Sequence, residues 1–563
     1  MTMTLADWLR AAQCPVPQEW MEDIPLRKPP YRHQIEGLNL LAQHVRFGLW
    51  DDMGLGKTYL MQAHALWLIG LGNRSVMVAP PVLLPQYLQS LKSNFPGIDQ
   101  KIRAEGYAGD VSYRQKLLDR WEQEGWPDLL VMSYRAFSGI GPSPAYRKAL
   151  TVTCQDQAEA LVNQLVKSAP GRDFVLSTVR WWLRQNGEQK RLSWFPEPAE
   201  DKVTTMTFDY NTLLQRGYTD VKVDEANCVS SHANDIHQAV KRFAGPVAES
   251  NGVTLATGTP INNSPQDAYG LFALLNPRRY GSKRAFDRHH VVSENFAGFN
   301  QVVGYQNLDF LYQGLYSIGR RITKKQVLDM PPKVITEVPV ELKDDHFKLY
   351  RKLCNERVLE LKDGEVLDAT QAIAFYHAAQ QMLLTPWDYG EVRDNALLEA
   401  LDQIVKGLDG RKVVIYCWYR RSVQTLMNRF KALNPVALYG DISPQEKENN
   451  KARFIEDPAC KVFILQIKAG GVGVDGLQTV CSDAVYAEIP TVPGVWSQSM
   501  DRLYRIGQQS TVNVYLLVPL RTIAVKLRNN LISKEDTANQ VVRDKKRLLA
   551  DLLGEEGLRG TLD

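Results

Sequence analysis

The sequence predicts an α/β protein with two lobes, each a parallel sheet covered by helices, and with helical insertions. Short apolar runs followed by helical stretches recur in two separate regions, the alternation typical of parallel α/β domains. The chain has 563 residues, which exceeds what one hydrophobic core normally serves. We therefore expect a multidomain globular protein.

The first α/β lobe is expected over residues 29–275, after an N-terminal segment 1–28. A stretch over residues 138–211 interrupts this lobe and is expected to be an insertion. The expected strands are Val45–Trp50, Ser75–Ala79, Leu129–Ser133, Asp220–Val223 and Val253–Ala256.

The second α/β lobe is expected over residues 397–520. Residues 276–396 are expected to form helical protrusions and a connector, and residues 521–563 a C-terminal helical brace. The expected strands of the second lobe are Lys412–Cys417, Val436–Leu438, Lys461–Gln466, Ala484–Ala487 and Val512–Val518.

Composition excludes several classes of protein. Seven scattered cysteines without a CxxC pair, and no clustered histidines, argue against a disulfide framework and a zinc site. No apolar run is long enough to span a bilayer, and the N-terminus lacks a secretory signal. We expect a cytoplasmic protein of a bacterial or phage-infected cell, or a nuclear one if the source is eukaryotic. The net charge of +4 does not identify a polyanionic partner.

A glycine-rich turn follows the first expected strand in WDDMGLGKTYLMQ. Gly54 and Gly56 allow backbone N–H groups to approach phosphate oxygens at a helix N-terminus. Lys57 is placed to meet the β- and γ-phosphates of ATP, and the Thr58 hydroxyl to ligate Mg²⁺. Asp51 stands where the strict pattern has glycine, so an ordinary Gly-Lys turn is the alternative.

Two neighbouring carboxylates, Asp224 and Glu225, follow the expected strand TDVKV. The C-terminal ends of parallel strands meet at one edge of a sheet, so both face the same crevice as the glycine-rich loop. Asp224 is suited to hold Mg²⁺, and Glu225 to orient and deprotonate the attacking water. The alternative is a solvated acidic turn.

Two arginines in the second lobe, Arg502 and Arg505, are three residues apart and share a helix face. Both guanidinium groups could meet the γ-phosphate across a cleft between the lobes, as arginine fingers do. The alternative is a solvated helix face. The lysine loop and carboxylate pair elsewhere in the chain favour the first interpretation.

In sequence order, these segments resemble the Swi/Snf family of DNA-translocating ATPases, helicase-like motors of superfamily two. The resemblance covers about residues 29–540 and implies two RecA-like lobes, ATP and Mg²⁺. The acidic residue at Asp51 is typical of this family. The segments that carry the resemblance are PPYRHQIEG, DDMGLGKT, APPVLLPQY, DLLVMSY, VDEAN, LATGTPINNS, RRITKKQVLDMPPK, KVVIYCWYRRSVQTL, AGGVGVDGLQ and QSMDRLYRIGQ.

The resemblance also implies a set of ATP-site residues. Gln34 corresponds to the family's adenine reader and Gln498 to a catalytic glutamine. The remaining expected ATP-binding residues are Asp52, Met53, Gly54, Leu55, Gly56, Lys57, Thr58, Gly473 and Asp475. The chain departs from the family at five positions: Asn227, Lys468, Asp475, Thr491 and Tyr504.

Nucleic-acid contacts are expected from segments that grip strands in the family, and such contacts to phosphates carry no sequence information. The expected residues are Ser133, Tyr134, Arg320, Arg321, Lys324, Lys468, Gly470 and Gly471. For the arginines at 320 and 321, an equally weighted alternative is that they brace the two lobes against acidic partners. Trp181 and Trp182 of the insertion suit base stacking, but a small hydrophobic core is the better interpretation.

The expected function is an ATP-dependent, sequence-independent translocase on duplex DNA that remodels or displaces bound proteins or branched DNA. One alternative is a strand-separating helicase acting on DNA or RNA, for which single strands are the substrate. A second alternative is an ATP-switched nucleic-acid-binding module without efficient hydrolysis, because Asn227 replaces the family's usual histidine. Protein partners, pathway and polarity are not predicted.

Overall fold

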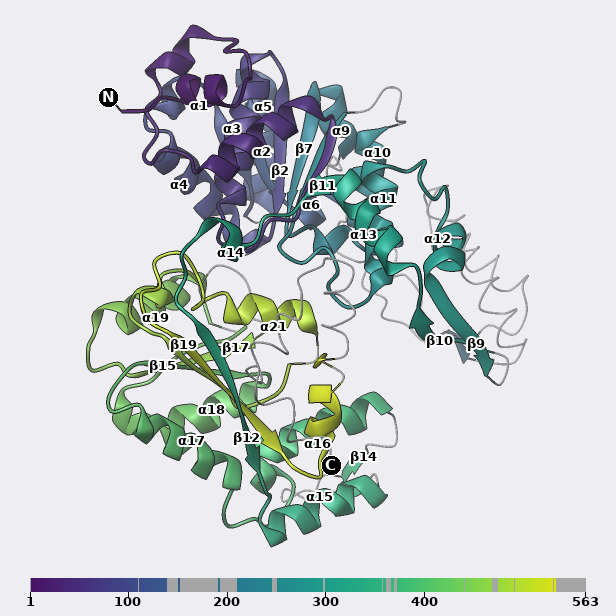
Figure 1. Cartoon of the computed structure of the whole chain (residues 1–563), viewed down its shortest axis with the longest axis vertical. Helices are drawn as coiled ribbons and strands as arrows, with labels where there is room; N and C mark the ends of the chain where they lie inside the picture. Colours follow the sequence, from purple (N-terminus) through teal and green to yellow (C-terminus); the bar gives the residue numbers. More distant parts are fainter. Residues whose placement is uncertain are drawn as a thin grey trace.

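Two parallel sheets organise the chain into an upper lobe 1 and a lower lobe 2 (Figure 1). The structure is a computed structural model, and it describes residues 2–109, 111–138, 150–151, 191–192, 210–245, 251–296, 299–356, 358–360, 366–368, 372–440, 442–467, 474–490, 492–529 and 531–532. Most of the 138–211 insertion and the tail beyond residue 532 lie outside these ranges. The prediction of two parallel-sheet lobes is confirmed.

Lobe 1 contains seven strands in the order β11-β1-β8-β7-β2-β4-β3, all paired in parallel. The strands are β1 (Arg46–Leu49), β2 (Arg74–Ala79), β3 (Ala104–Tyr107), β4 (Leu129–Ser133), β7 (Tyr218–Asp224), β8 (Gly252–Ala256) and β11 (Gly319–Arg320). The helices are α1 (Leu5–Ala11), α2 (Arg32–Gln43), α3 (Lys57–Gly70), α4 (Leu84–Asn94), α5 (Val111–Glu124), α6 (Tyr134–Ser138), α9 (Tyr210–Gln215), α10 (Asp235–Ala244) and α11 (Ala268–Leu275).

Helices cover both faces of the lobe 1 sheet, and successive strand residues serve different cores. Val76 and Val78 belong to the core that contains residues of α10 and α11, whereas Met77 and Ala79 belong to the core that contains residues of α1 to α4. Side chains alternate across a strand, so a strand buried on both faces has a continuous apolar run. That run is why the central strands were predictable from sequence.

Lobe 2 contains six strands in the order β12-β19-β18-β15-β17-β16, again all parallel. The strands are β12 (Lys333–Val340), β15 (Val413–Cys417), β16 (Val436–Leu438), β17 (Val462–Gln466), β18 (Asp483–Tyr486) and β19 (Val512–Pro519). The helices around this sheet are α15 (Asp344–Glu356), α16 (Ala372–Leu384), α17 (Ala396–Gly407), α18 (Arg420–Arg429), α19 (Pro444–Glu456) and α21 (Pro493–Met500).

The sheets extend beyond the expected limits of the lobes. The expected connector region, 276–396, contributes β11 to lobe 1 and β12 to lobe 2, and the short helix α14 (Lys324–Val327) lies between them. Residues 1–28 are also part of lobe 1, because Leu5, Trp8 and Leu9 are fully buried in its core. The region 276–396 also contains the helices α12 (Lys283–His290) and α13 (Leu308–Ser317). It contains two hairpins that sequence patterning missed: β9 (Val291–Phe296) with β10 (Phe299–Tyr305), and β13 (Val358–Glu360) with β14 (Val366–Asp368).

A buried ionic network lies inside the sheet of lobe 1. The Lys222 ammonium group is fully buried, donates to Asp220 at 2.7 Å and lies 2.9 Å from His64 Nδ1. Burial, together with the nearby Lys222 charge, lowers the pKa of His64, so this imidazole is neutral and accepts from the ammonium group. Ser75 donates to the same carboxylate, which completes the pairing that a buried charge requires.

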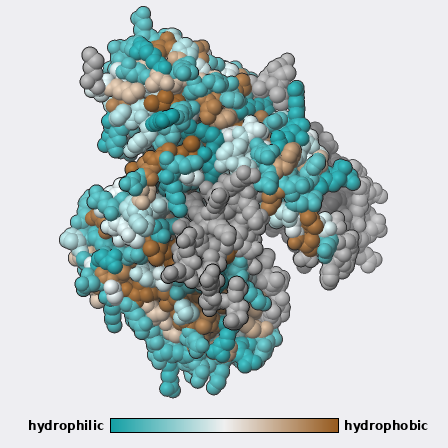
Figure 2. Space-filling model, viewed as in Figure 1, coloured by the Kyte–Doolittle hydropathy of each residue, from teal (hydrophilic) through white to brown (hydrophobic). Residues whose placement is uncertain are grey.

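On the face of the molecule shown in Figure 2, hydrophilic residues predominate at the periphery of both lobes. Within the described part of the chain, no helix combines the length and apolar character needed to cross a membrane.

Candidate nucleotide-binding site between the lobes

The glycine-rich loop joins β1 to α3 and adopts the conformation that its glycines permit. Gly54 and Gly56 have φ angles of 85° and 79°, in the left-handed region that favours glycine. The Lys57 ammonium group donates to the backbone carbonyls of Asp51 at 2.6 Å and Asp52 at 3.1 Å, so it lies over the loop. The loop and the first turn of α3 therefore form the anion-binding geometry expected of a phosphate site.

The two predicted carboxylates lie at the end of β7 and line the same cavity as the loop. Asp224 is the last residue of the strand, and Glu225 follows with a φ of 47°. The cavity has a volume of about 410 Å³ and is also lined by Lys57 and Thr58. Burial raises the pKa of Asp224 to about 7, and repulsion from Glu225 adds to the shift. Burial likewise raises the pKa of Glu225, against the attraction of Lys57 and Arg502.

Lobe 2 supplies the opposite wall of this cavity. Gln498, on α21, donates its amide to the Glu225 carboxylate at 3.2 Å. Arg502 is buried and donates to the Val474 carbonyl at 3.2 Å, while Arg505 pairs with Asp475 at 3.4 Å. A Cβ built at Gly54 would lie 3.1 Å from the Arg505 side chain, so this arginine packs directly over the glycine-rich loop. The structure therefore brings together the predicted lysine, carboxylates, glutamine and arginines.

The donor set of the cavity fits Mg²⁺. Thr58 and Asp224 both line it and present a hydroxyl and a carboxylate oxygen, the hard ligands that this ion prefers. These two residues would hold the metal together with phosphate oxygens of the nucleotide. The described residues contain no cluster of three or more His, Cys, Asp or Glu side chains that could hold a metal by themselves.

Asp51, the residue that replaces the expected glycine, binds the connector between the lobes. Its carboxylate accepts from the Arg320 guanidinium at 2.7 Å and from the Ile322 backbone N–H at 3.0 Å. Arg320 also donates to the His33 carbonyl at 2.5 Å. Asp51 is 1% exposed and Arg320 8% exposed, so this ion pair is inside the protein. The aspartate that stands in place of the glycine therefore has a structural role, because it attaches the connector.

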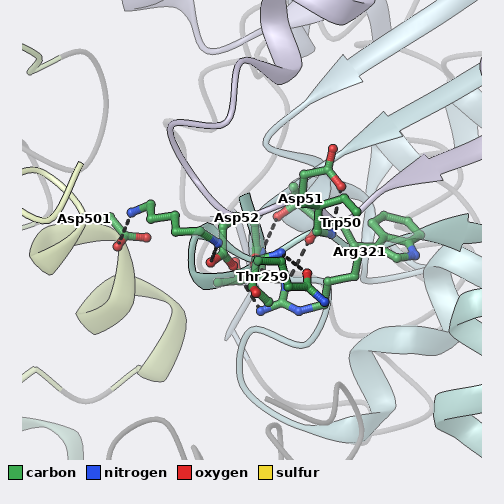
Figure 3. Close-up of polar contacts among 12 residues, drawn as sticks. Trp50, Asp51, Asp52, Thr259, Arg321 and Asp501 are labelled. Carbon is green, nitrogen blue, oxygen red and sulfur yellow. Dashed lines mark hydrogen bonds and ion pairs between the residues drawn. The ribbon is translucent and has the colours of Figure 1, made fainter. Parts of the chain in front are cut away.

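Asp52 forms a second buried link to the same segment (Figure 3). It accepts from Arg321 at 3.2 Å and from the Lys324 backbone N–H at 2.9 Å. Arg321 also donates to the carbonyls of Trp50 at 3.0 Å and Gly258 at 3.2 Å. The segment 320–324 is therefore fixed to the base of the glycine-rich loop at several points.

The connector continues from this attachment to lobe 2. The Lys324 side chain is 1% exposed. Its ammonium group donates to Asp501 at 2.8 Å and to the Tyr504 carbonyl at 2.5 Å. Both acceptors lie in the segment that carries Arg502 and Arg505. A direct backbone contact, from Gly494 N–H to the Asn262 carbonyl at 3.3 Å, adds to the contacts that Lys324 and Gln498 make between the lobes.

These contacts bear on both interpretations of the basic connector. The nucleic-acid prediction for Arg320, Arg321 and Lys324 is not supported, because their cationic groups are buried and bound to acidic and carbonyl groups of the protein. The two arginines do meet acidic partners, Asp51 and Asp52, but these pairs lie within lobe 1, whereas Lys324 bridges to Asp501 in lobe 2. Dense positive charge in a sequence does not distinguish the two, since the acidic partners lie far away along the chain.

Gln34 contacts the glycine-rich loop from α2. Its side chain accepts from the Tyr31 backbone N–H at 3.0 Å and donates to the Leu55 carbonyl at 3.1 Å. A Cβ at Gly56 would lie 2.3 Å from the Gln34 amide nitrogen. Met53 lines the nucleotide cavity, whereas Leu55 is buried in the core. Adenine recognition by Gln34 stays a prediction.

The remaining nucleic-acid predictions are untested by the described contacts. Tyr134 donates its hydroxyl to the Asp224 carbonyl at 2.7 Å, and Ser133 accepts from the Ala136 N–H at 3.3 Å. The first of these bonds ties the start of α6, directly after β4, to the end of β7. Lys468, Gly470, Gly471 and Gly473 lie outside the described residues, as do Thr491, Trp181 and Trp182.

Glu488 is a buried carboxylate of lobe 2 that sequence reasoning missed. It follows β18 and is 6% exposed. Its carboxylate accepts from the backbone N–H groups of Trp418 and Tyr419 and from the Ser422 hydroxyl at 2.6 Å. It therefore fixes the loop after β15 to the segment that follows β18. The only signal in the sequence was an acidic residue in the otherwise apolar run YAEIP, which is weak evidence by itself.

Comparison with known proteins agrees with this geometry. Two family models match, the SNF2-related domain over residues 172–385 and the helicase conserved C-terminal domain over residues 396–507. An uncharacterized ATP-dependent helicase of Mycoplasma genitalium is 24% identical over 66% of this chain and 36% of its own length. The TATA-binding protein-associated factor MOT1 of Saccharomyces cerevisiae is 24% identical over 65% of this chain and 23% of its own length.

The human DNA annealing helicase and endonuclease ZRANB3 is 23% identical over 62% of this chain and 32% of its own length. The chain thus spans about a third or less of these curated relatives. The Sulfolobus solfataricus SWI2/SNF2 ATPase core in complex with dsDNA aligns with 19% identity, a TM-score of 0.35, and coverage of 92% of this chain and 95% of that chain. A TM-score at this level supports no further conclusion.

The fold and the site define a two-lobed nucleotide-binding protein with its cavity at the junction of two parallel-sheet lobes. The two family models together match more than half of the sequence. The chain belongs to the Swi/Snf family of helicase-like ATPases in superfamily two.

Replacing Asp51 by Gly restores the residue of the strict phosphate-loop pattern, and we expect it to destabilise the protein. The Arg320 guanidinium would stay buried without its carboxylate, a loss that typically costs about 3–5 kcal/mol. Thermal unfolding should show a lower midpoint, with no gain in affinity for a fluorescent ATP analogue. Asp51→Asn, which keeps an acceptor for the Ile322 N–H, is the control and should lower the unfolding midpoint less. An unchanged midpoint in Asp51→Gly would contradict the structural role of this residue.

Glu488 should make the stability of lobe 2 depend on pH. Burial raises the pKa of Glu488 from 4.5 to about 7. Because the pKa is higher in the folded state, the contribution of Glu488 to the free energy of unfolding is complete below pH 4.5. This contribution is lost as the pH rises to about 7, and the loss is roughly 3 kcal/mol at most. Thermal unfolding of the wild type and Glu488→Gln across this pH range measures the effect. Parallel pH profiles for the two proteins would show that Glu488 does not titrate there.

Proposed function

We propose that this protein is an ATP-dependent, sequence-independent translocase on duplex DNA that remodels or displaces bound proteins or branched DNA. The observation that carries the proposal is the cavity shared by the lobes. Lys57, Asp224 and Glu225 enter it from lobe 1, and Gln498, Arg502 and Arg505 enter it from lobe 2. Such a cavity couples the chemistry of a nucleotide to the relative position of two bodies.

Each residue of the cavity has a role in hydrolysis that its position supports. Lys57 and the N–H groups of the loop bind the phosphates. Glu225 orients and deprotonates the attacking water, and its raised pKa makes it a stronger base than an exposed glutamate. Gln498 holds the Glu225 carboxylate through its amide. Bound Mg²⁺ would neutralise charge on the phosphate oxygens.

The two arginines respond to the nucleotide from the other lobe. Arg502 and Arg505 line the cavity, so their positive charge favours the negative charge of a γ-phosphate. Release of that phosphate removes the attraction, and the lobes separate. If each lobe holds DNA through its backbone phosphates, one cycle of closing and opening moves the protein along the duplex without reading its sequence.

The named relatives support nucleic acid as the partner. One curated relative is described as a DNA annealing helicase and endonuclease, and another as an ATP-dependent helicase. The strand-separating helicase and the ATP-switched binding module remain the alternatives. The first would be stimulated by single strands of DNA or RNA, and the second would bind ATP without appreciable turnover.

The roles of the cavity residues are tested by Lys57→Ala, Glu225→Gln and Arg505→Ala. We expect each to lower kcat for ATP hydrolysis by about 10²-fold or more, because each removes a charge or proton acceptor used in the transition state. Steady-state hydrolysis is measured with no nucleic acid, single-stranded DNA, duplex DNA and RNA. Lys325→Ala, an exposed neighbour of the connector, is the control and should keep wild-type activity.

Duplex DNA should stimulate the wild type most strongly. Greater stimulation by single strands would favour the strand-separating helicase, and no hydrolysis under any condition would favour the binding module. Full activity in any of the three variants would contradict the assignment of that residue.

A further inference from the structure

A projection from lobe 1 carries an exposed surface that the proposed mechanism does not use. We define the projection as α12, the hairpin β9–β10 and α13, which together extend away from the sheet of lobe 1 (Figure 1). Half of the exposed large hydrophobic side chains of the described chain lie here, namely Val292, Val302, Val303, Phe310 and Tyr316. Exposed apolar side chains gathered on one element indicate a binding surface.

Positive charge lies beside this apolar surface. Arg284 and Arg288, on α12, and Arg278, just before it, are exposed. Within the described chain, none of the three has an acidic partner within ion-pair distance. Arg284 and Arg288 are four residues apart, so their like charges repel on one helix face. A polyanion bound there would relieve this repulsion.

The charged face is held in a fixed orientation. Lys283 pairs with Asp287 on another side of α12, and Phe286 is fully buried below it. At the end of the helix, Asn307 donates its amide to the His289 carbonyl at 2.7 Å, which ties α12 to the start of α13. The arginines are therefore presented by a rigid element and need little ordering upon binding.

The shape of the hairpin argues against a protein strand as the partner. Its register shifts between Val302 and Gly304, which inserts an extra residue in β10. A bulge of this kind bends a strand and hinders pairing with an added strand along its edge. Val302 and Val303 are 41% and 51% exposed at the bulge. Hydrophobic residues gather at the position of the hairpin and hydrophilic ones over α12 (Figure 2).

We propose that the projection is a second nucleic-acid contact that binds DNA at a fork, where paired and unpaired strands meet. Arg284 and Arg288 bind backbone phosphates, and Val302 and Val303 contact unpaired bases. The outside of a duplex offers phosphates and sugars, whereas unpaired bases expose apolar faces that such side chains can cover. This inference rests on the proposed function, since it assumes that the motor acts on DNA.

The test measures binding of a fluorescently labelled DNA fork and a blunt duplex of equal length over a range of salt concentrations. Arg284→Ala/Arg288→Ala should weaken fork binding by about tenfold or more at low salt. For this variant, the slope of log Kobs against log salt concentration should become less negative by roughly 1.8, the value for two lost phosphate contacts on duplex DNA. Arg32→Ala/Lys116→Ala, which removes the same charge from exposed positions on α2 and α5, is the control.

The apolar contact has its own variant. Val302→Ser/Val303→Ser should reduce the preference for fork over duplex while leaving duplex affinity and nucleic-acid-free ATP hydrolysis unchanged. Both double variants should unfold at the same midpoint temperature as the wild type, which is the control for normal folding.

The inference is overturned if the arginine variant binds the fork as tightly as the control does, and an acidic protein segment would then be the better partner. It is also overturned if the wild type binds fork and duplex equally. Failure of the proposed function is distinct, because in that case wild-type ATP hydrolysis would not respond to any nucleic acid.

Discussion

The paired contacts of Asp51 with Arg320 and Asp52 with Arg321 connect the glycine-rich loop to the segment that leads from the sheet of lobe 1 to the sheet of lobe 2. All four side chains are buried, so each charge depends on its partner for compensation. The position of the loop, the course of the connector and the entry into lobe 2 are therefore set together. A change at any one of these residues would alter the others.

The cavity depends on this arrangement from both sides. From the loop, Lys57 and Thr58 begin α3 and line the cavity. From the connector, Lys324 binds Asp501 and the Tyr504 carbonyl, which places the segment with Arg502 and Arg505 opposite the loop. The contact between Gln498 and Glu225 then spans the two lobes at the carboxylate that we propose as the general base. Chemistry and lobe position are thus linked through a small number of buried polar contacts.

The elements with a strong local signal in the sequence could be predicted. The central strands were predictable because burial on both faces requires a continuous apolar run, as in Ser75–Ala79. The glycine-rich loop was predictable because its positive φ angles favour glycine. The residues around the cavity were found by combining the loop with Asp224, Glu225 and the arginine helix face.

Other features had no local signal. Asp51 and Arg320 are 269 positions apart, so their pairing follows from the topology that makes β11 a neighbour of β1. The strand β11 has two residues and β3 contains a glycine, too little pattern for either to be identified. The strands of the hairpin β9–β10, VVSENF and FNQVVGY, lack a regular alternation of polar and apolar residues, and their region was interpreted as helical. Glu488 became recognisable only when its three donors were seen around it.

The central claim is that the connector contacts hold the lobes in position around the nucleotide cavity. The most direct measurement is the distribution of distances between fluorophores at Leu71 in lobe 1 and Ala432 in lobe 2, both exposed, in nucleotide-free protein. Lys324→Met removes the contacts to Asp501 and the Tyr504 carbonyl, and it should broaden this distribution, whereas the exposed neighbour variant Lys325→Met should not. Identical distributions in the wild type and Lys324→Met would contradict the account.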